Sequence, residues 1–434
     1  MLDGFAITAI GILAVIAAVL GIVIVAKWQH RSLWAATPVV LWPTSTIYVQ
    51  AAIVAVLAIG TVIGSRSRIH ETKRPILLFL GFALCMVIVL IVHGPPEVVE
   101  PAAARNLLIA MLLGIAVVPI TALQRPPLIP SLKALALSGA AVSVYVLATY
   151  GVLGGRVASE THNPNAIGLA ASLAFLSALG VALLTRRSRW ILVAVPSLML
   201  FAGTQNRSGL IVIAVGAVLL WLLQRTSRTR VVGAMVVLSA APFVIDIVLA
   251  SQSALFSRRQ TVNFGVEARF EVLSLALRLA IEHPFLGVGW RHFTDESLRT
   301  LDVALNTHND YALVAAEGGL LAFVLFVGIV VRGLTFRDPT KEGRALQALA
   351  LAAGLTLFFG NMITDFRVTW PLWVLIGMAW SSTRDRERPN SAANERLGIN
   401  AGSPDSLGTL QTDRVDLAPK VVRFRAARQV DAPE

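Results

Sequence analysis

Long apolar runs, separated by short polar stretches, recur along most of the chain. Each run is close to the roughly 17–25 residues that a helix needs to cross a bilayer. The runs do not alternate between polar and apolar residues, so the short alternating strands of a membrane barrel are not expected. We predict about twelve membrane helices, at 5–26, 45–64, 75–93, 105–123, 131–153, 164–185, 190–203, 208–224, 231–250, 311–331, 345–363 and 366–380.

Some segments fit this pattern less well. The runs 190–203 and 366–380 are short for a span and are expected to be tilted or re-entrant. The apolar piece 33–46 is interrupted by prolines, and the pattern does not place it. The first run, 5–26, lacks the preceding basic residues of a secretory signal, so we interpret it as a retained anchor.

Lysine and arginine residues predict which loops are cytoplasmic. The loops after the even-numbered runs contain most of them, and the alternate short loops contain few. Short cytoplasmic loops carry an excess of these residues, so we expect the first set and both ends of the chain to be cytoplasmic. Lys27 and Arg31, in the first outer loop, are a local exception. The formal net charge of +12 follows from this pattern and requires no nucleic-acid partner.

Composition agrees with an integral membrane protein. Of the 434 residues 56% are apolar and 14% are charged, against roughly 45–50% and about 25% in soluble domains. The predicted fold class is therefore an all-α, polytopic membrane protein, with a transmembrane domain over 1–380. A large extracytoplasmic loop, 251–310, separates the ninth and tenth helices, and the tail 381–434 is expected to be disordered because it has few large apolar residues.

One amphipathic helix is predicted in the large loop, over 267–283. Arg269 falls inside its apolar arc, so the guanidinium is directed toward the protein or the membrane. Such an arginine either reaches water and an acidic partner or binds an anionic ligand. The apolar arc contains Phe270, Leu273, Leu277, Ala280 and Ile281, and the polar stripe contains Glu271, Ser274, Arg278 and Glu282.

A second unusual cation, Arg207, lies in the tight outer turn "TQNRSG". Asn206 and Ser208 are both able to cap the helix that follows. A helix amino end beside an arginine favours an anion such as phosphate. An arginine at a membrane interface is also common without any ligand. Both interpretations of Arg207 stay open on this pattern alone.

His308, Asn309 and Asp310 stand directly before the tenth run, and Glu317 lies inside it. An imidazole can accept a proton at neutral pH, and the neighbouring amide or carboxylate can orient it. On a continuous helix Glu317 would point away from His308 and share a face with Asp310, where both carboxylates could meet a cation from another span. A carboxylate inside a span is costly, so we interpret Glu317 as a polar link between helices.

Another outer segment, "GGRVASETHNPNAIG", carries Asn165 just after a helix start at Pro164. The histidines of the chain are scattered, it has one cysteine, and no acidic pair is spaced as D-x-D. Neither a metal site nor a cofactor is therefore expected. No glycine-rich phosphate loop is present either.

Three stretches, in this order, resemble the O-antigen ligase/polymerase family of bacterial envelope glycosyltransferases. The first is "NRSG", with Arg207 opening a span; the second is "ARFEVLSLALRLAIEHPFLGVGW", with Arg269 near its start. The third is "THNDYALVAAEGG", with His308, Glu317 and Gly319. The recognisable part covers about 160–335, and each stretch alone is a weak signal.

Two positions depart from the family pattern. The glycine usually found three residues beyond Gly319 is Ala322 here. Arg291 and His292 follow "GVGW", where the family more often has a small or polar residue. The second departure is consistent with a different acceptor and leaves the choice between ligase and polymerase open.

The resemblance implies a metal-independent, inverting transfer of a glycan from undecaprenyl diphosphate to an acceptor hydroxyl outside the cytoplasmic membrane. Arg207 and Arg269 would bind the carrier diphosphate, and His308 would accept the proton of the attacking hydroxyl. The implied partners are the lipid-linked glycan, a lipid- or glycan-linked acceptor and the lipids of a bacterial inner membrane, in lipopolysaccharide or other surface polysaccharide assembly. Supporting roles are expected for Asn309, Asp310, Glu317, Asn165 and Arg291.

Two other functions stay open. A chain polymerase of the same family takes the same kind of donor and differs in its acceptor, so one sequence does not separate it from a ligase. A transporter or flippase would carry polar residues near the bilayer midplane, on broken and repeated helices. Here the polar residues are predicted at the outer ends of spans, beside a long outer loop, which favours chemistry at the membrane surface.

Overall fold

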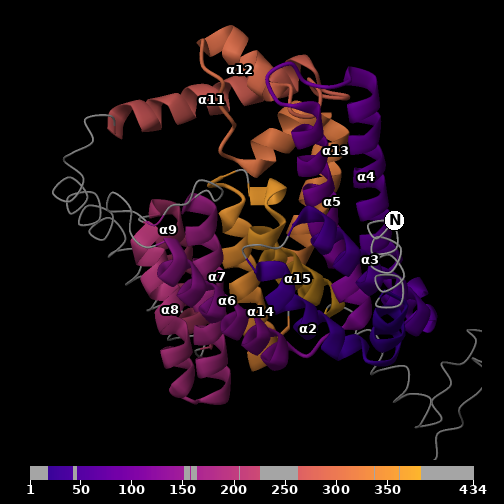
Figure 1. The fold of residues 1–434 in the computed structure, drawn as a ribbon, viewed down its shortest axis with the longest axis vertical. Coiled ribbons are helices and arrows are strands. Elements are labelled where there is room, and N and C mark those ends of the chain that lie inside the picture. The colour runs from indigo at the N-terminus through magenta and orange to yellow at the C-terminus, as the bar shows by residue number, and fades with distance from the viewer. Residues whose placement is uncertain are drawn as a thin grey trace, which may run out of the picture. The chain divides into compact units, whose positions relative to one another are not determined.

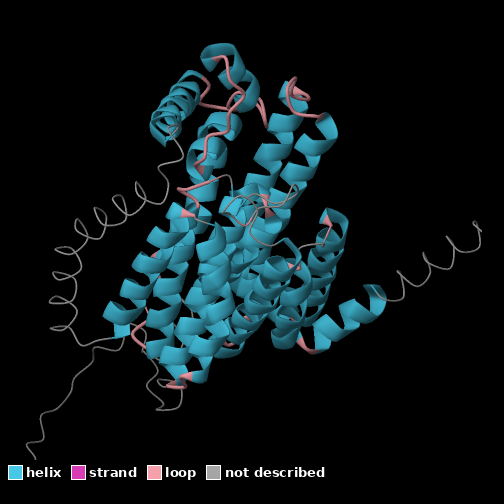
Figure 2. Cartoon of the chain, turned by 60° about the vertical axis from the view of Figure 1, so that its left-hand side comes forward, coloured by secondary structure: helices cyan, strands magenta, loops and turns pink. Residues whose placement is uncertain are grey.

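The computed structural model describes residues 18–42, 46–150, 157, 164–204, 206–224, 262–336, 338–360 and 362–382. Within these ranges the chain is helical and contains no strand (Figures 1 and 2). The predicted run 231–250, most of 5–26 and nearly all of the tail 381–434 lie outside the described residues. The helices before the large loop are α2 (Gln29–Leu41), α3 (Ile47–Gly64), η1 (Arg66–Thr72), α4 (Lys73–His93), α5 (Pro101–Gln124), α6 (Leu128–Tyr150), α7 (Pro164–Thr185), α8 (Arg189–Thr204) and α9 (Arg207–Gln224). Those that follow are α11 (Val262–Glu282), α12 (Phe293–Leu301), α13 (Asp310–Leu334), α14 (Lys341–Thr356), η2 (Met362–Thr364) and α15 (Phe366–Ser382).

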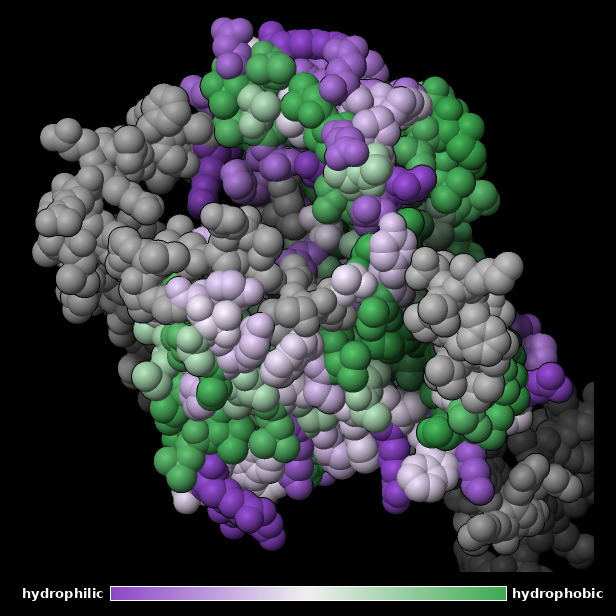
Figure 3. Space-filling model, in the orientation of Figure 1, coloured by the Kyte–Doolittle hydropathy of each residue, from purple (hydrophilic) through white to green (hydrophobic). Residues whose placement is uncertain are grey.

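Six stretches of the described chain are long and apolar enough to cross a membrane: α3, η1 with α4, α5, α6, α7 and α13. The shorter α8 and α9 are also apolar. Hydrophilic side chains gather at the top and bottom ends of the view in Figure 3, and hydrophobic ones cover much of the flank between them. The chain is a polytopic membrane protein, all-helical over the described residues; the count of twelve spans rests partly on residues outside these ranges.

Residues 33–46, which the hydropathy pattern does not place, lie mostly in a short helix, α2, which contains Pro38. Trp34 donates its indole N–H to Ser131 of α6 (3.0 Å), and Thr37 accepts the indole N–H of Trp370 from α15 (3.2 Å). These two bonds hold α2 between neighbouring helices. Its buried side includes the polar Ser32 and Thr37, whereas the apolar Val39 is exposed, so its sequence shows no single apolar face from which the helix could have been predicted.

The predicted run 345–363 is wrong at its carboxyl end, because helix α14 stops at Thr356. The following chain turns and is held by the start of α13. Leu357 accepts the backbone N–H of Asp310 (2.8 Å), and the Asp310 carboxylate accepts the backbone N–H groups of Met362 (2.9 Å) and Ile363 (3.3 Å). Apolar residues in this turn continue the hydrophobic signal of α14 beyond the end of the helix.

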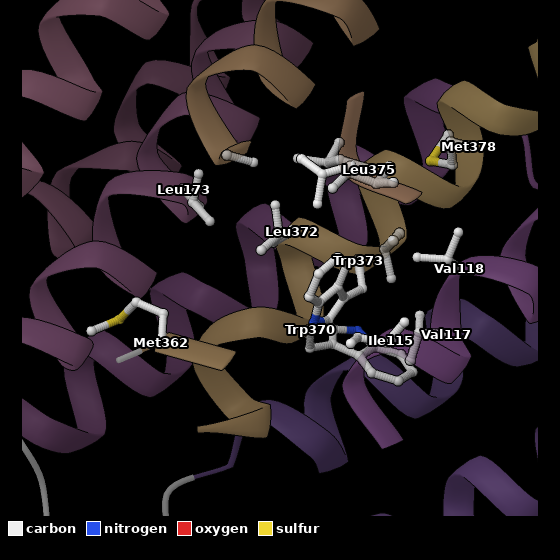
Figure 4. Packing of buried hydrophobic residues seen from close by; sticks show 14 of the residues in the cluster. Ile115, Val117, Val118, Leu173, Met362, Trp370, Leu372, Trp373, Leu375 and Met378 are labelled. Carbon is white, nitrogen blue, oxygen red and sulfur yellow. The ribbon is translucent and has the colours of Figure 1, made fainter. Parts of the chain in front are cut away.

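Helix α15 lies in the centre of the core and packs closely on α5. Trp370 and Trp373 are fully buried and point toward Ile115 and Val117 of α5 (Figure 4). The two helices approach closely at Gly114, where an added Cβ would lie 2.8 Å from the Trp373 indole nitrogen. The aromatic residues therefore fill the interior of the bundle below the outer loops.

Residues 283–301, which include α12, form a cap over one end of the bundle, and α11, just before the cap, packs on α13 (Figure 1). Trp290 donates its indole N–H to the carbonyl of Ala104 in α5 (2.8 Å). The buried Asp295 accepts the backbone N–H groups of Glu97 (3.0 Å) and Val98 (2.8 Å), between α4 and α5. His292 contacts the same carboxylate at 3.2 Å. These contacts hold the cap on the α4–α5 connection.

Candidate active site

The segment after α11 is joined to a break in α13. The break is at Gly319 (φ 75°, ψ 179°), inside a helix that otherwise runs from Asp310 to Leu334. Val288 donates to the carbonyl of Ala316 (2.9 Å), Gly289 to that of Glu317 (3.2 Å), and Leu320 donates to the carbonyl of Pro284 (2.6 Å). Backbone groups that the broken helix leaves unpaired are thus satisfied by the loop. We call residues 284–289 and 316–320 the glycine seam.

The glycines of this seam are required by backbone contact. Gly287 has φ 61°, and a Cβ there would lie 2.5 Å from the carbonyl oxygen of Ala316. A Cβ on Gly319 would collide with the carbonyl of Phe285. Because the colliding atoms belong to the backbone, a side chain at either position could not be accommodated by rotation. This accounts physically for the glycines of "FLGVG" and "EGG".

His308 stands outside helix α13, two residues before its first turn. Its backbone is left-handed (φ 51°), a strained conformation for a residue with a side chain that occurs often at functional sites. Asn309 caps the helix by accepting the backbone N–H of Ala312 (3.0 Å). Asp310 is occupied with the amides of Met362 and Ile363. Both side chains thus bind backbone N–H groups, and a role for either of them in orienting the imidazole stays a prediction.

A cleft of about 520 Å³ opens beside His308, and we call it the outer cleft. Its walls come from the starts of α3, α5 and α7, the cap and the turn between α14 and α15. The polar residues that line it are Gln50, Asn106, Asn165, Arg291, Asn306, His308, Thr364 and Asp365.

Arg291 enters this cleft from the cap, just after the glycine seam. It is only 7% exposed and also has a left-handed backbone (φ 67°). One terminal nitrogen donates to the side-chain oxygen of Asn306 (3.0 Å), while its buried Nε has no hydrogen-bond partner within the described residues. A buried guanidinium with donors to spare is a candidate anion-binding group.

Glu317 is completely buried behind the cleft, in the glycine seam. Its carboxylate lies close to the positive charge of Arg291 and to the backbone N–H groups of Arg291 and Phe293, in the cap, and neither oxygen forms a hydrogen bond within the described residues. Within the described residues, Asp310 binds the turn after α14, and no cation from another span is seen between it and Glu317. Glu317 instead connects α13 to the cap.

Arg269, on α11, is exposed and lies close enough to influence His308 electrostatically. The pKa of the His308 imidazole is lowered, first by its removal from water and then by the positive charge of Arg269. His308 is therefore neutral at pH 7, which is the protonation state that a general base requires.

Arg207 is the first residue of α9, and its side chain lies outside the described part of the structure. Its neighbour Asn206 donates to the backbone carbonyl of Asn165 (2.6 Å) and accepts the backbone N–H of Gly209 (3.2 Å). The starts of α7 and α9 are thereby tied together, and Asn165 lines the outer cleft. The backbone of Arg207 is thus held near the cleft wall.

Residues 191–327 match the family model described as O-antigen ligase. The match contains α8, α9, the cap and most of α13, together with His308, Arg269 and Arg207. This part of the chain is therefore similar to the O-antigen ligase family. No curated protein matches the sequence. The match indicates a membrane glycosyltransferase-like enzyme, with ligase- or polymerase-like function in polysaccharide assembly.

The cleft walls are not confined to the matched residues, and sequence reasoning missed several of them. Asn106 and Gln50 come from helices before residue 191, and Thr364 and Asp365 follow residue 327. Asn106 and Gln50 had a usable signal, because each is a polar residue near the outer end of an apolar run. Thr364 and Asp365 had a similar signal, because they form the short predicted outer loop between the runs 345–363 and 366–380.

Metal binding has no candidate in the described residues, where no three His, Cys, Asp or Glu side chains are grouped closely enough to hold an ion. A metal-independent reaction stays a prediction for this protein. Glycan transfer by proton abstraction and charge stabilisation needs only the types of side chain that line the outer cleft.

Proposed function

We propose that this protein transfers a glycan from undecaprenyl diphosphate to an acceptor hydroxyl in the outer cleft, as an O-antigen ligase. The observation that carries the proposal is the presence of His308 and Arg291 in one cleft whose other polar walls are mainly amides and hydroxyls. Amide and hydroxyl groups suit the hydroxyl groups of sugars, and the two basic side chains suit the reacting atoms.

In the proposed reaction, His308 accepts the proton of the acceptor hydroxyl as that oxygen attacks the anomeric carbon of the donor sugar. The bond from this carbon to the diphosphate oxygen breaks, and the lipid diphosphate leaves with the electron pair. One displacement inverts the anomeric configuration. The lowered pKa of His308 keeps the imidazole neutral before the transfer.

The departing diphosphate develops negative charge that arginines are suited to stabilise. Arg291 has buried donors in the cleft. Arg269, on α11, lies close enough to His308 for its charge to act on the imidazole. Arg207, at the start of α9, would approach from the wall that contains Asn165. A guanidinium can bind two phosphate oxygens at once, so three arginines around the cleft would hold the diphosphate firmly.

A transporter would require a path through the bundle. The outer cleft lies at one end of the helices, and the large buried residues of α15, including Trp370 and Trp373, fill the interior. This packing favours chemistry at the membrane surface. A chain polymerase would use the same donor-binding residues and bind a growing glycan in place of a lipid-linked core as the acceptor.

The proposal is tested with purified protein in liposomes, undecaprenyl-diphosphate glycan, a lipid-linked core acceptor and a metal chelator. Wild-type protein should transfer the glycan with the chelator present. His308→Ala should lower turnover by about 10²–10⁴-fold, the usual contribution of a general base, and retain donor binding. His283→Ala removes an exposed imidazole from the same cap and should be close to wild type.

Four results would contradict this proposal in different ways. Near-normal turnover by His308→Ala would exclude the histidine as the base. Sensitivity to the chelator would exclude a metal-free mechanism. Movement of the donor across the bilayer without transfer would indicate a flippase, and lengthening of the glycan with no product on the core acceptor would indicate a polymerase.

A further inference from the structure

Helix α11 presents three different faces. One face packs on the protein; its four side chains are buried against α12, α13 and the loop before α13. This is not the apolar arc predicted from the sequence. The buried residues are Val272, Leu275, Ala276 and Leu279.

The predicted apolar arc is instead exposed in part: Leu273 and Ala280 are half-buried, and its three other residues are exposed. Phe270 is 69% exposed, Leu277 53% and Ile281 79%, and Phe285 just after the helix is 84% exposed. The polar stripe that includes Ser274 is exposed as well, but on a separate side of the helix. At about 100° per residue, the buried face, the apolar arc and the polar stripe are centred roughly 120° apart.

Three faces indicate three environments. A helix between protein and water alone needs one buried face and one polar face. Here the solvent-accessible side is divided between large apolar side chains and charged ones. Exposed aromatic and aliphatic residues grouped in this way mark a surface that contacts an apolar partner.

The exposed apolar arc of α11 is continuous with the outward surface of α13. Phe285 lies in the glycine seam, where its neighbour Pro284 accepts the backbone N–H of Leu320 (2.6 Å). Leu320 and Val324 are exposed apolar residues of α13, a helix long and apolar enough to cross the membrane. A lipid bilayer that covers Leu320 therefore reaches the level of Phe285.

We propose that the apolar arc of α11, with Phe285, docks on the phospholipid surface on the side of the outer cleft, so that α11 is an interfacial helix. Its polar stripe then faces water, as in other interfacial amphipathic helices. Arg269 lies between the lipid-facing arc and the buried face, at the boundary with the cleft. The membrane surface would thus hold Arg269 at the level of lipid phosphates. This docking does not depend on the transfer reaction.

The test uses the single cysteine of the chain, Cys85, replaced by serine. Ile281→Cys and, as a matched control on the polar stripe, Ser274→Cys are each labelled with a nitroxide. The protein is placed in phosphatidylethanolamine–phosphatidylglycerol vesicles. Collision of each nitroxide with oxygen, which concentrates in lipid, is compared with collision with a water-soluble nickel chelate. The label at residue 281 should favour oxygen, and the label at residue 274 should favour the chelate.

Equal access of the chelate to both labels would overturn the proposal, because the arc would then face water. Dipolar coupling between labels at residue 281 of two protomers, in lipid-rich vesicles, would show that a second copy covers the arc and would overturn it too. Both substitutions are at exposed positions, so folding is preserved in either variant. No outcome depends on transferase activity, so failure here would leave the proposed function untouched.

Discussion

The outer cleft and the glycine seam both take residues from the stretches 284–291 and 306–320, yet the two regions use these residues differently. In the cleft, His308 and Arg291 direct their side chains toward open space. In the seam, the glycines allow the backbone of the loop to lie against the backbone of α13, and the Glu317 carboxylate lies beside backbone N–H groups of the cap. Closeness in a motif therefore does not imply a shared role in the chemistry.

The two regions are nevertheless dependent on one another. The break at Gly319 leaves backbone groups unpaired within a span, and the loop 284–289 satisfies them. The same loop then carries Arg291 into the cleft. Changes in the seam should consequently reduce folding first, whereas changes in the cleft should reduce turnover and leave folding intact.

Gly319→Ala should give the largest effect, as a loss of folded protein. The backbone at Gly319 lies in a region almost restricted to glycine, which alone costs about 1–3 kcal/mol for another residue, and the new methyl would strike the carbonyl of Phe285. Gly328→Ala on the same helix is the control, because the nearest atom to an added Cβ is 3.9 Å away. Thermal unfolding and the yield of monodisperse protein measure both. Equal stability of the two variants would show that the seam is not strained as described.

Arg291→Lys should reduce turnover by about 10–100-fold, the factor that corresponds to losing roughly 1.5–3 kcal/mol of charged hydrogen bonding. Lysine keeps the charge but lacks the planar pair of donors that fits a phosphate. Donor binding should weaken, and thermal stability should change little. Arg299→Lys, at an exposed ion pair with Glu97 (3.1 Å) on the same cap, is the control and should be near wild type. Unfolding of Arg291→Lys would show that Arg291 mainly stabilises the fold, as the residues of the seam do.

Glu317→Gln should give a smaller effect, mainly on stability. The amide keeps the size of the carboxylate but loses its charge toward the N–H groups of Arg291 and Phe293, which should cost about 1–3 kcal/mol. Turnover per folded molecule should stay within a few-fold of wild type. Turnover is normalised to the folded fraction measured by size exclusion. A stable, fully folded variant without turnover would move Glu317 from the seam to the chemistry.

Sequence patterns predicted most of the fold because membrane helices depend on continuous hydrophobicity, which is a local property. The spans 105–123 and 164–185 correspond closely to α5 and α7. Prediction failed where tertiary contacts decide the structure. Helix α2 exists between α6 and α15, and α14 ends where Asp310 binds the following turn.

The candidate site could be predicted only in part. His308, Arg291 and Asn165 do line one cleft, as their placement on the outer side suggested. The roles of Asn309 and Asp310 could not be predicted, since an N-cap and a carboxylate that holds a distant turn both depend on three-dimensional contacts. Asn106 and Asp365 were missed because the elements that bring them to the cleft are far apart in sequence.

The smallest predicted effect is a shift in pH dependence, which tests whether Arg269 acts on His308. Transfer requires the neutral imidazole, so the rate falls as the pH drops through the pKa of His308. Burial and the charge of Arg269 place this pKa below the ordinary value of 6.5. Wild-type activity at pH 6.5 should therefore exceed half of its maximum. Arg269→Gln removes a positive charge, which raises the pKa of His308 and moves the acidic limb of the profile to higher pH.

The two effects of Arg269→Gln are separable, because weaker donor binding lowers the whole profile, whereas a changed pKa displaces its acidic limb. The comparison therefore uses turnover at saturating donor, with each profile scaled to its own maximum. Arg278→Gln is the control; Arg278 lies on the polar stripe of the same helix, 4.0 Å from Glu282, and should leave the limb unmoved. An unmoved limb in Arg269→Gln would mean that the titrating base is a group other than His308 or that Arg269 does not act on it. An acidic limb displaced only in Arg269→Gln would show that a charge on α11 sets the pKa of the base in the outer cleft.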